Sequence, residues 1–322
     1  MKRVPEPIKA VLKNRFGRRL QEQTPLSGLT TAHVGGPAEI LISIETGAEL
    51  SETCQYLWEN DIPMMVMGAG SNLLFSEDGF CGVILLNRAR RIEINPTSTP
   101  PQIFAESGAN LGMLARKAAL AGIAGLEWAS TVPGTVGGAV YGNAGAFGGD
   151  IHRNLLLAEI LQRNEGRQTF TNETMEYAYR SSILKRQPRK SVIISAVFTG
   201  TQDDPIAIQE RMRVYSERRR STQPPGASMG SMFKNPQGDY AGRLIEAAGL
   251  KGTQIGGARI SEIHANFFVN SPDSKSNDIW QLVQLAQAAV FDKFQVKLEL
   301  EVEAIGFSSQ PNNVTSSIGK AV

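Results

Sequence analysis

Two segments in the second half of the sequence carry side chains that could take part in catalysis. Arg180 stands between a tyrosine and two serines, and its guanidinium could pair with a carboxylate or a phosphate. Ser231, Lys234 and Asn235 bring a hydroxyl, an ammonium group and an amide close together. No paired histidine and acid accompany Ser231, so this is not a hydrolase nucleophile. From the residues alone, a solvated basic surface at Arg180 and a turn with a capping serine at Ser231 remain the simpler interpretations.

A third candidate segment lies near the end of the chain. Glu299, Glu301 and Glu303 alternate with apolar residues, and in a strand this alternation places the three carboxylates on one face. A strand with one face in water explains the pattern completely, so the residues alone give none of these glutamates a catalytic role. The histidines are scattered without the spacing of metal ligands, and we expect no metal site.

Two glycine-containing loops could hold phosphate groups. The first, Gly68-Ala69-Gly70-Ser71-Asn72, has Leu73 where the dinucleotide fingerprint G-x-G-x-x-G requires its third glycine, and a strand is expected after it instead of a long helix. What remains is a tight turn whose backbone N–H groups and polar side chains suit phosphate oxygens. A plain structural turn between two strands is the alternative interpretation.

The second loop lies in a glycine-dense stretch between Thr131 and Gly149. We expect the backbone there to turn sharply or to approach a ligand, and not to form the interior of a helix or strand. Two such loops in adjacent α/β units could hold one extended diphosphate ligand between them. A loop that is merely tightly packed is the alternative.

The elements that must position these loops alternate between helix and strand. We expect helices over residues 50–58 and 111–121, the second capped by Asn110 and ended by Gly122, and strands over 64–67 and 83–86. After Pro224-Pro225 we expect helices over 241–248 and 279–290 and strands over 266–269 and 296–305.

Composition limits the classes of protein that remain. The 322 residues carry a net charge of +2 and are 41% hydrophobic, which excludes a disordered chain and disfavours a nucleic acid or a membrane as the main partner. Cys54 and Cys81 are the only two cysteines and form no C-x-x-C motif, so two buried free thiols in a reducing compartment are expected. No secretory signal or membrane-spanning run is evident, and we expect a cytoplasmic protein.

Taken together and in order, these segments resemble the UDP-N-acetylenolpyruvoylglucosamine reductase (MurB) family, in the group that lacks an inserted tyrosine-bearing loop. The resemblance spans about residues 24 to 306. Its motifs are Gly35-Gly36-Pro37-Ala38, Gly68-Ala69-Gly70-Ser71-Asn72-Leu73-Leu74, Pro133 to Ala139, Asn143-Ala144-Gly145-Ala146, Tyr179-Arg180-Ser181-Ser182, Gly230-Ser231, Phe233-Lys234-Asn235-Pro236 and Leu298 to Val302.

The resemblance implies an α+β fold with three parts. These are a two-domain FAD-binding module of the vanillyl-alcohol oxidase (PCMH-type) kind and a C-terminal α/β substrate-binding domain. We place the FAD-binding subdomains at residues 1–93 and 94–222 and the substrate-binding domain at 223–306, and we expect a flexible tail over 307–322.

The resemblance also implies the reaction. An NADPH-dependent oxidoreductase of this family uses non-covalently bound FAD to reduce the enolpyruvyl CH–CH bond of UDP-N-acetylglucosamine enolpyruvate, giving UDP-N-acetylmuramate for peptidoglycan synthesis. The implied partners are this nucleotide-sugar and NADPH, and we expect a monomer. Two alternatives remain: a different flavin oxidase or dehydrogenase of the same superfamily, and a flavin-dependent nucleotide-sugar sensor without turnover.

Residue roles carry over with the motifs. The implied catalytic residues are Arg180, Ser231 and Glu301, and the implied substrate-binding residues are Arg180, Lys234 and Asn235. The implied contacts to the FAD diphosphate are Gly68, Ala69, Gly70, Ser71, Asn72, Pro133, Gly134, Thr135, Gly137, Gly138, Asn143, Gly145 and Ala146.

Overall fold

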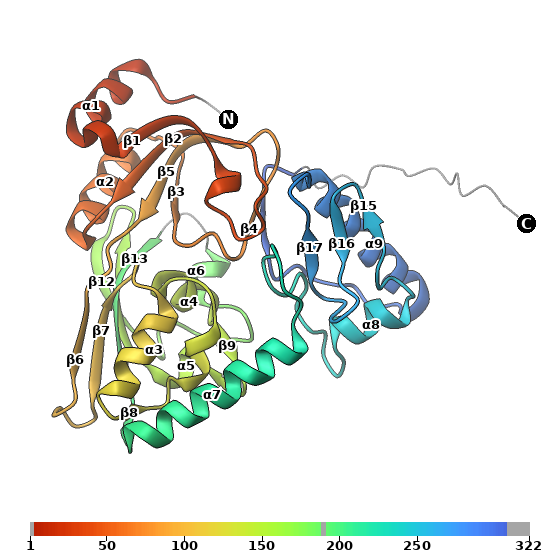
Figure 1. The fold of residues 1–322 in the computed structure, drawn as a ribbon. Coiled ribbons are helices and arrows are strands. Elements are labelled where there is room, and N and C mark those ends of the chain that lie inside the picture. Colours follow the sequence, from red (N-terminus) through yellow and green to blue (C-terminus); the bar gives the residue numbers. More distant parts are fainter. Residues whose placement is uncertain (1–2, 188–190, 308–322) are drawn as a thin grey trace, which may run out of the picture.

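Two α/β units lie side by side, and a smaller third unit stands beside them (Figure 1). The structure is a computed structural model, and it describes residues 3–187 and 191–307. No helix in this described part of the chain has the length and apolar character needed to cross a membrane.

The first unit is built on a four-stranded sheet with the order β1-β2-β5-β3. Strands β2, β5 and β3 are parallel, which requires a crossover, and α2 supplies it between β2 and β3. The elements of this unit are α1 (Glu6–Phe16), η1 (Gly17–Arg19), β1 (Leu20–Pro25), η2 (Leu26–Gly28), β2 (Pro37–Ile44), α2 (Gly47–Glu59), β3 (Met64–Met67), β4 (Leu73–Phe75) and β5 (Phe80–Asn87).

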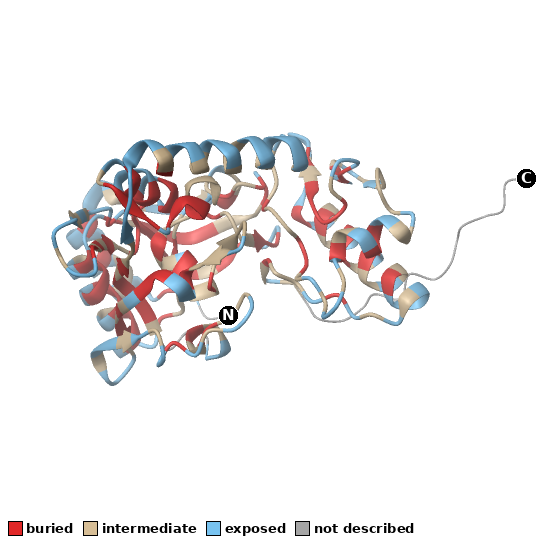
Figure 2. Ribbon diagram, turned by 90° about the horizontal axis from the view of Figure 1, so that it is seen from below, coloured by how far each residue is buried: buried red, intermediate tan, exposed pale blue. Residues whose placement is uncertain are grey.

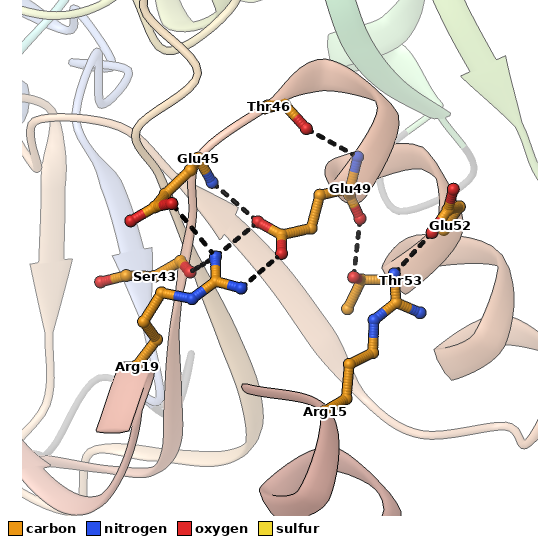
Figure 3. A network of polar contacts seen from close by, with 8 residues as sticks. All are labelled: Arg15, Arg19, Ser43, Glu45, Thr46, Glu49, Glu52 and Thr53. Carbon is orange, nitrogen blue, oxygen red and sulfur yellow. Dashed lines mark hydrogen bonds and ion pairs between the residues drawn. The ribbon is translucent and has the colours of Figure 1, made fainter. Parts of the chain in front are cut away.

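Polar contacts fix the start of α2 against the N-terminal segment (Figure 3). Thr46 is the N-cap, and its hydroxyl accepts a hydrogen bond from the backbone N–H of Glu49 at 3.1 Å. The Glu49 carboxylate in turn accepts two hydrogen bonds from Arg19, at 2.7 and 2.8 Å. This bidentate pair ties η1 to the first turn of α2, so the helix predicted from residue 50 is anchored at its N-terminus.

The second unit is built on a five-stranded antiparallel sheet with the order β12-β11-β13-β7-β6. As predicted, Asn110 caps α3 by accepting a hydrogen bond from Met113, and Gly122 follows the helix with a φ of 72°. The main elements are β6 (Ile92–Asn95), β7 (Gln102–Glu106), α3 (Leu111–Leu120), η3 (Glu127–Thr131), α4 (Val136–Gly142), β11 (Leu155–Gln162), β12 (Gly166–Thr171), β13 (Ser191–Thr199) and α7 (Pro205–Thr222). Shorter elements are β8 (Ile123–Ala124), β9 (Gly145–Ala146), β10 (Gly149–Asp150), α5 (Ile151–Asn154), α6 (Ile183–Arg186) and β14 (Thr201–Gln202).

The glycine-dense stretch corrects one expectation. Residues Val136–Gly142 form helix α4 although three of them are glycines. Val136, Ala139 and Val140 are buried and anchor the helix in the core of the second unit. Tertiary packing therefore outweighs the low helix propensity of glycine here.

Helix α7 was not expected, and it runs along the outside of the second unit toward the third (Figures 1 and 2). Only Ile208 is buried among its residues, so it lacks the apolar stripe by which a surface helix is recognised in a sequence. Arg211 anchors it, because its guanidinium donates to Glu127 of η3 at 2.8 and 3.0 Å. The C-terminal end of the helix thereby reaches the space between the units.

The third unit packs helices α8 and α9 against a three-stranded sheet with the order β15-β16-β17. Its elements are α8 (Ala241–Ala247), β15 (Gln254–Ile255), β16 (Ala258–Ile260), β17 (Phe268–Asn270), α9 (Ser276–Phe294) and β18 (Glu303–Ile305). Strand β18 does not join this sheet but pairs in parallel with β4 of the first unit. The end of the described chain thus returns to the first unit.

Three further expectations need correction. The strand predicted over residues 296–305 is reduced to β18, and the chain before it makes only an isolated bridge between Leu300 and Phe233. Cys54 is buried as expected, but Cys81 is only half-buried. Phe307, placed in the flexible tail, stacks on Trp280 at 4.6 Å between ring centroids, while the rest of the predicted tail lies outside the described residues.

Candidate active site

A cavity of about 860 Å³ lies where the three units meet, near the upper end of the range for small-molecule sites. Both glycine loops and all three residues of the implied catalytic trio line it, although they come from widely separated parts of the chain. The expected site residues that line it are Gly68, Ala69, Gly70, Ser71, Asn72, Pro133, Gly134, Thr135, Gly137, Gly138, Gly145, Ala146, Arg180, Ser231 and Glu301.

The two glycine loops touch each other at one wall of this cavity. The hydroxyl of Ser71 donates to the carbonyl of Pro133 at 3.3 Å. A Cβ atom added to Gly68 would lie 2.9 Å from Cγ2 and 3.1 Å from Cβ of Thr135. The absence of a side chain at Gly68 is therefore what allows the loops to approach each other.

The N-terminus of α4 uses some of its backbone donors within the protein. The N–H groups of Val136 and Gly137 both donate to backbone carbonyls, those of Ala109 and Ser107, at 2.8 Å each. A Cβ atom on Gly137 would also meet Ser107, at 2.9 Å. Gly137 thus has a packing role, and its own N–H is not directed at the cavity.

Asn143 is the one expected loop residue that does not line the cavity. It is 5% exposed and adopts the left-handed conformation at the C-cap of α4, with a φ of 48°. Its amide donates to the carbonyl of Ala178 at 3.1 Å and accepts from the N–H of His152 at 3.0 Å. Asn143 therefore supports the turn that carries Arg180.

Arg180 stands at the tip of that turn. Ala178 and Ser181 exchange two backbone hydrogen bonds of 3.1 Å across it, and Arg180 has a φ of 53°, which is unusual for a residue with a side chain. Its Nε lies 2.8 Å from Oε1 of Glu301, but no hydrogen bond is directed along this contact. The two side chains form an ion pair in a partly enclosed space, 24% and 18% exposed.

Glu301 is not a water-facing strand residue. It lies in a bend just before β18, and its side chain points to the cavity and not to bulk solvent. Burial raises the pKa of its carboxyl above the ordinary value, although the positive charges of Arg180 and two lysines oppose that effect. A carboxyl with a perturbed pKa in a cleft is a feature of functional sites.

Ser231 is held by its neighbours along the backbone. It bridges to Phe267, while Met232 donates to the carbonyl of Asn266 at 2.8 Å and accepts from the N–H of Glu301 at 2.9 Å. The Ser231 segment thus runs between the Asn266 segment and the Glu301 segment. This arrangement delivers the hydroxyl of Ser231 and the carboxyl of Glu301 to the same cavity.

Lys234 and Asn235 are not among the residues that line the cavity. Lys234 is paired with Glu299 at 3.3 Å, although its charge still acts on Glu301. The Asn235 side chain accepts from the N–H of Ala241 at 3.1 Å, which satisfies a donor at the start of α8. In this state both residues serve the third unit.

Two basic residues in the cavity wall were missed at the sequence level. Lys185 lies in α6, a short helix that Ser182 caps, and it pairs with Glu303 at 3.4 Å. Arg219 lies near the end of α7, and within residues 3–187 and 191–307 its guanidinium has no ion pair or hydrogen bond. Burial lowers the pKa of Arg219, so an anionic ligand would stabilise its charge.

Comparisons with known proteins agree with this arrangement. Residues 38–171 match the model of an FAD binding domain, and residues 222–305 match the model of the UDP-N-acetylenolpyruvoylglucosamine reductase, C-terminal domain. The UDP-N-acetylenolpyruvoylglucosamine reductase of Chloroflexus aggregans is 40% identical over 289 residues, covering 89% of this chain and 97% of the relative. That of Bacillus subtilis is 35% identical over 302 residues, covering 94% and 99%.

A solved structure gives the same result. The crystal structure of UDP-N-acetylenolpyruvylglucosamine reductase (MurB) from Thermus caldophilus has a TM-score of 0.74 and 32% identity, covering 87% of this chain and 97% of that one. The expected α+β fold is confirmed, with an FAD-binding domain followed by the C-terminal domain of the reductase family. The chain belongs to the UDP-N-acetylenolpyruvoylglucosamine reductase family.

Proposed function

We propose that this chain catalyses the NADPH-dependent, FAD-mediated reduction of UDP-N-acetylglucosamine enolpyruvate to UDP-N-acetylmuramate in peptidoglycan precursor synthesis. The observation that carries the proposal is the single cavity that both glycine loops share with Arg180, Ser231 and Glu301. A cofactor held by the loops and a substrate held by the trio would therefore meet in one enclosed space.

The residues of the cavity fit FAD. The loops touch at Gly68 and Thr135, which leaves a backbone cradle with the Ser71 hydroxyl beside it, suited to a diphosphate. No histidine or cysteine is among the described residues that line the cavity, which supports non-covalent binding. When bound, FAD supplies hydride chemistry, taking a hydride from NADPH and giving one to C3 of the enolpyruvyl group. Acid precipitation should leave the flavin in solution, and a coloured pellet would contradict non-covalent binding.

Arg180 and Glu301 act on the charge that develops on the substrate. Hydride addition at C3 leaves an electron pair at C2 that spreads into the adjacent carboxylate. The guanidinium of Arg180 stabilises that carboxylate, and the fixed position of Arg180 at the tip of its turn limits the reorganisation needed. Glu301, with a raised pKa, hydrogen-bonds the enol-like form of the substrate.

Ser231 supplies the proton that completes the reaction at C2. Its O–H bond breaks as the C2–H bond forms, and the alkoxide regains a proton afterwards. A serine hydroxyl is a weak acid, so positive charge nearby must stabilise the alkoxide. The charges of Lys185 and Lys234, both of which act on Glu301, support such a field in this part of the site.

Arg219 is our candidate for the diphosphate of the nucleotide-sugar. It is the described cavity-lining cation that lacks a protein partner, whereas Arg180 and Lys185 are paired with Glu301 and Glu303. Arginine binds phosphate oxygens in a bidentate manner. Lys234 and Asn235 stay proposed as substrate contacts, which requires that they turn from their present partners when substrate binds.

One chain supplies every element of the site, which supports a monomeric enzyme. We also propose that the enzyme acts in the cytoplasm. Light scattering on the purified protein would test the first statement. A mass of twice 34.9 kDa would contradict it.

The decisive experiment separates the two half-reactions in a Ser231→Ala variant by stopped-flow flavin absorbance. Flavin reduction by NADPH needs no proton at C2, so its rate should stay within about twofold of the wild type. Reoxidation by the enolpyruvyl substrate should slow by roughly 10²- to 10⁴-fold, the usual effect of losing a positioned general acid.

Other outcomes would refute parts of the proposal. Equal slowing of both halves would indicate a displaced flavin, and unchanged reoxidation would remove Ser231 from the mechanism. Wild-type protein that oxidises NADPH without the enolpyruvyl substrate would favour a different flavin oxidase. Binding of the nucleotide-sugar without any turnover would favour a sensor.

A further inference from the structure

The backbone around Glu301 lacks the support that a regular strand would provide. The expected strand is interrupted by a bend at residues 301 and 302, and ladder pairing with β4 begins only at Glu303. The N–H of Glu301 donates to Met232, but its carbonyl has no ladder partner. The main chain at Glu301 is therefore fixed on its N–H side, and its carbonyl needs another partner.

Asn72 holds it from the opposite unit. Its side-chain amide donates to the carbonyl of Glu301 at 3.0 Å, and its own carbonyl accepts from the N–H of Glu303 at 3.0 Å. These hydrogen bonds enclose the bend from both ends, and the first of them connects residues 229 positions apart in sequence. The amide of Asn72 therefore replaces the ladder bond that the bend removes.

The position of Asn72 gives this contact a functional meaning. Asn72 ends the first glycine loop, and the preceding residue, Ser71, bonds the second loop through Pro133. The same five-residue turn thus touches the other diphosphate loop on one side and the bend of Glu301 on the other. A hydrogen bond to the carbonyl of Glu301 fixes the main chain at that residue. The position of the main chain in turn sets the position of the Glu301 carboxyl relative to Arg180.

We propose that Asn72 is a positioning residue for Glu301, holding its carboxyl against Arg180 by a hydrogen bond to the main chain. This inference rests on the role of Glu301 in the proposed function and adds to it a task for Asn72 beyond contact with a diphosphate. The consequence is that the loop that binds the cofactor also sets the geometry of the step that reduces the substrate.

The test is a double-mutant cycle on FAD-saturated enzyme with Asn72→Ala, Glu301→Gln and both together. In Asn72→Ala, reoxidation by the enolpyruvyl substrate should slow about tenfold more than flavin reduction by NADPH does, as when an orienting partner is lost. In the Glu301→Gln background, Asn72→Ala should change reoxidation by less than about twofold, because the side chain that it positions is already altered.

A pH profile distinguishes positioning from general damage. A carboxyl released from its enclosed place regains solvent, so the limb of the reoxidation profile that Glu301→Gln abolishes should move to lower pH in Asn72→Ala. A purely structural effect would lower the rate equally at all pH values. Asn72→Leu keeps the approximate size of the side chain, removes the donor and adds no charge, so it should reproduce the shift. Thermal unfolding of both variants checks that they fold.

Ser71→Ala is the matched control, since it alters the same loop without a contact to Glu301. We expect it to weaken FAD retention, to leave the pH limb in place and to act independently of Glu301→Gln. If the effects of Asn72→Ala and Glu301→Gln on the reoxidation rate multiply independently, or if the limb of the pH profile does not move in Asn72→Ala, the role of Asn72 is refuted and the proposed function is not affected. Unchanged reoxidation in Glu301→Gln itself would instead refute the proposed role of Glu301, and Asn72 would lose its task with it.

Discussion

Gly68→Ala should weaken FAD binding although it adds a single methyl group. The new Cβ atom would lie 2.9 Å from Cγ2 and 3.1 Å from Cβ of Thr135, and closer still to its hydroxyl oxygen. Real Cβ atoms do not approach heavy atoms so closely, so the two glycine loops must separate. The free protein can relax in this way, whereas binding a diphosphate across both loops would force them together again.

The size of the effect follows from that strain. Overpacking by one methyl group costs about 1–3 kcal/mol. If binding must restore the strained geometry, the dissociation constant for FAD rises by roughly 5- to 150-fold, since each 1.4 kcal/mol is a factor of ten. The assay is titration of the apoprotein with FAD, followed by the quenching of flavin fluorescence.

Two controls make the reasoning refutable. Thr135→Gly removes all three side-chain atoms that the new methyl group would meet, so the double variant should bind FAD within about threefold of Thr135→Gly alone. Gly28→Ala adds a methyl group where nothing lies within 4 Å, and it should leave the dissociation constant unchanged. An unchanged dissociation constant in Gly68→Ala, or no rescue by Thr135→Gly, would show that the contact does not govern the cradle.

Two further predictions concern charge in the cavity. Arg219→Met should raise KM for the nucleotide-sugar about tenfold with little change in kcat, because a charge-assisted hydrogen bond contributes about 1.5–3 kcal/mol. Arg220→Met, on the exposed side of the same helix, should change neither constant. Equal effects in the two variants would contradict the assignment of Arg219. Because burial raises the pKa of Glu301 above its unfolded value, the stability it contributes is complete at low pH and is lost as the pH rises through the folded pKa. The Tm of the Glu301→Gln apoprotein minus that of the wild-type apoprotein should therefore increase as the pH rises from 4.5 toward neutrality. A difference in Tm that does not change with pH would refute the raised pKa.

The sequence predicted the elements whose signals are local. The cap at Asn110, the stop at Gly122 and the apolar strand Met64–Met67 depend on neighbouring residues, and the structure has them as expected. The two glycine-containing loops suggested one shared ligand site from the residues alone, and only the resemblance to a family added Arg180, Ser231 and Glu301 to it. Individual roles of these residues stay predictions.

The missed features depend on contacts between distant residues. The burial of Glu301 arises because Asn72 and β4, more than two hundred positions earlier, pair with its segment, and no periodicity reports this. Helix α4 forms in a glycine-dense segment because its apolar residues reach the core. Helix α7 lacks an apolar stripe, yet Asp204-Pro205 is a recognisable helix start that would have predicted it, and with it the approach of Arg219 to the cavity.

The pairing of β18 with β4 has a consequence for the order in which the protein can fold during synthesis. Strand β4 is complete once residue 75 has been made, but its partner is the last strand of the described chain, Glu303–Ile305. On the ribosome, β4 and the loop before it must wait for more than two hundred further residues before they can make that pairing. The two α/β sheets can form earlier from their own strands. The part of the cavity that the Glu301 segment closes is therefore completed late, and a chain that stops short of residue 303 would lack the pairing of β18 with β4.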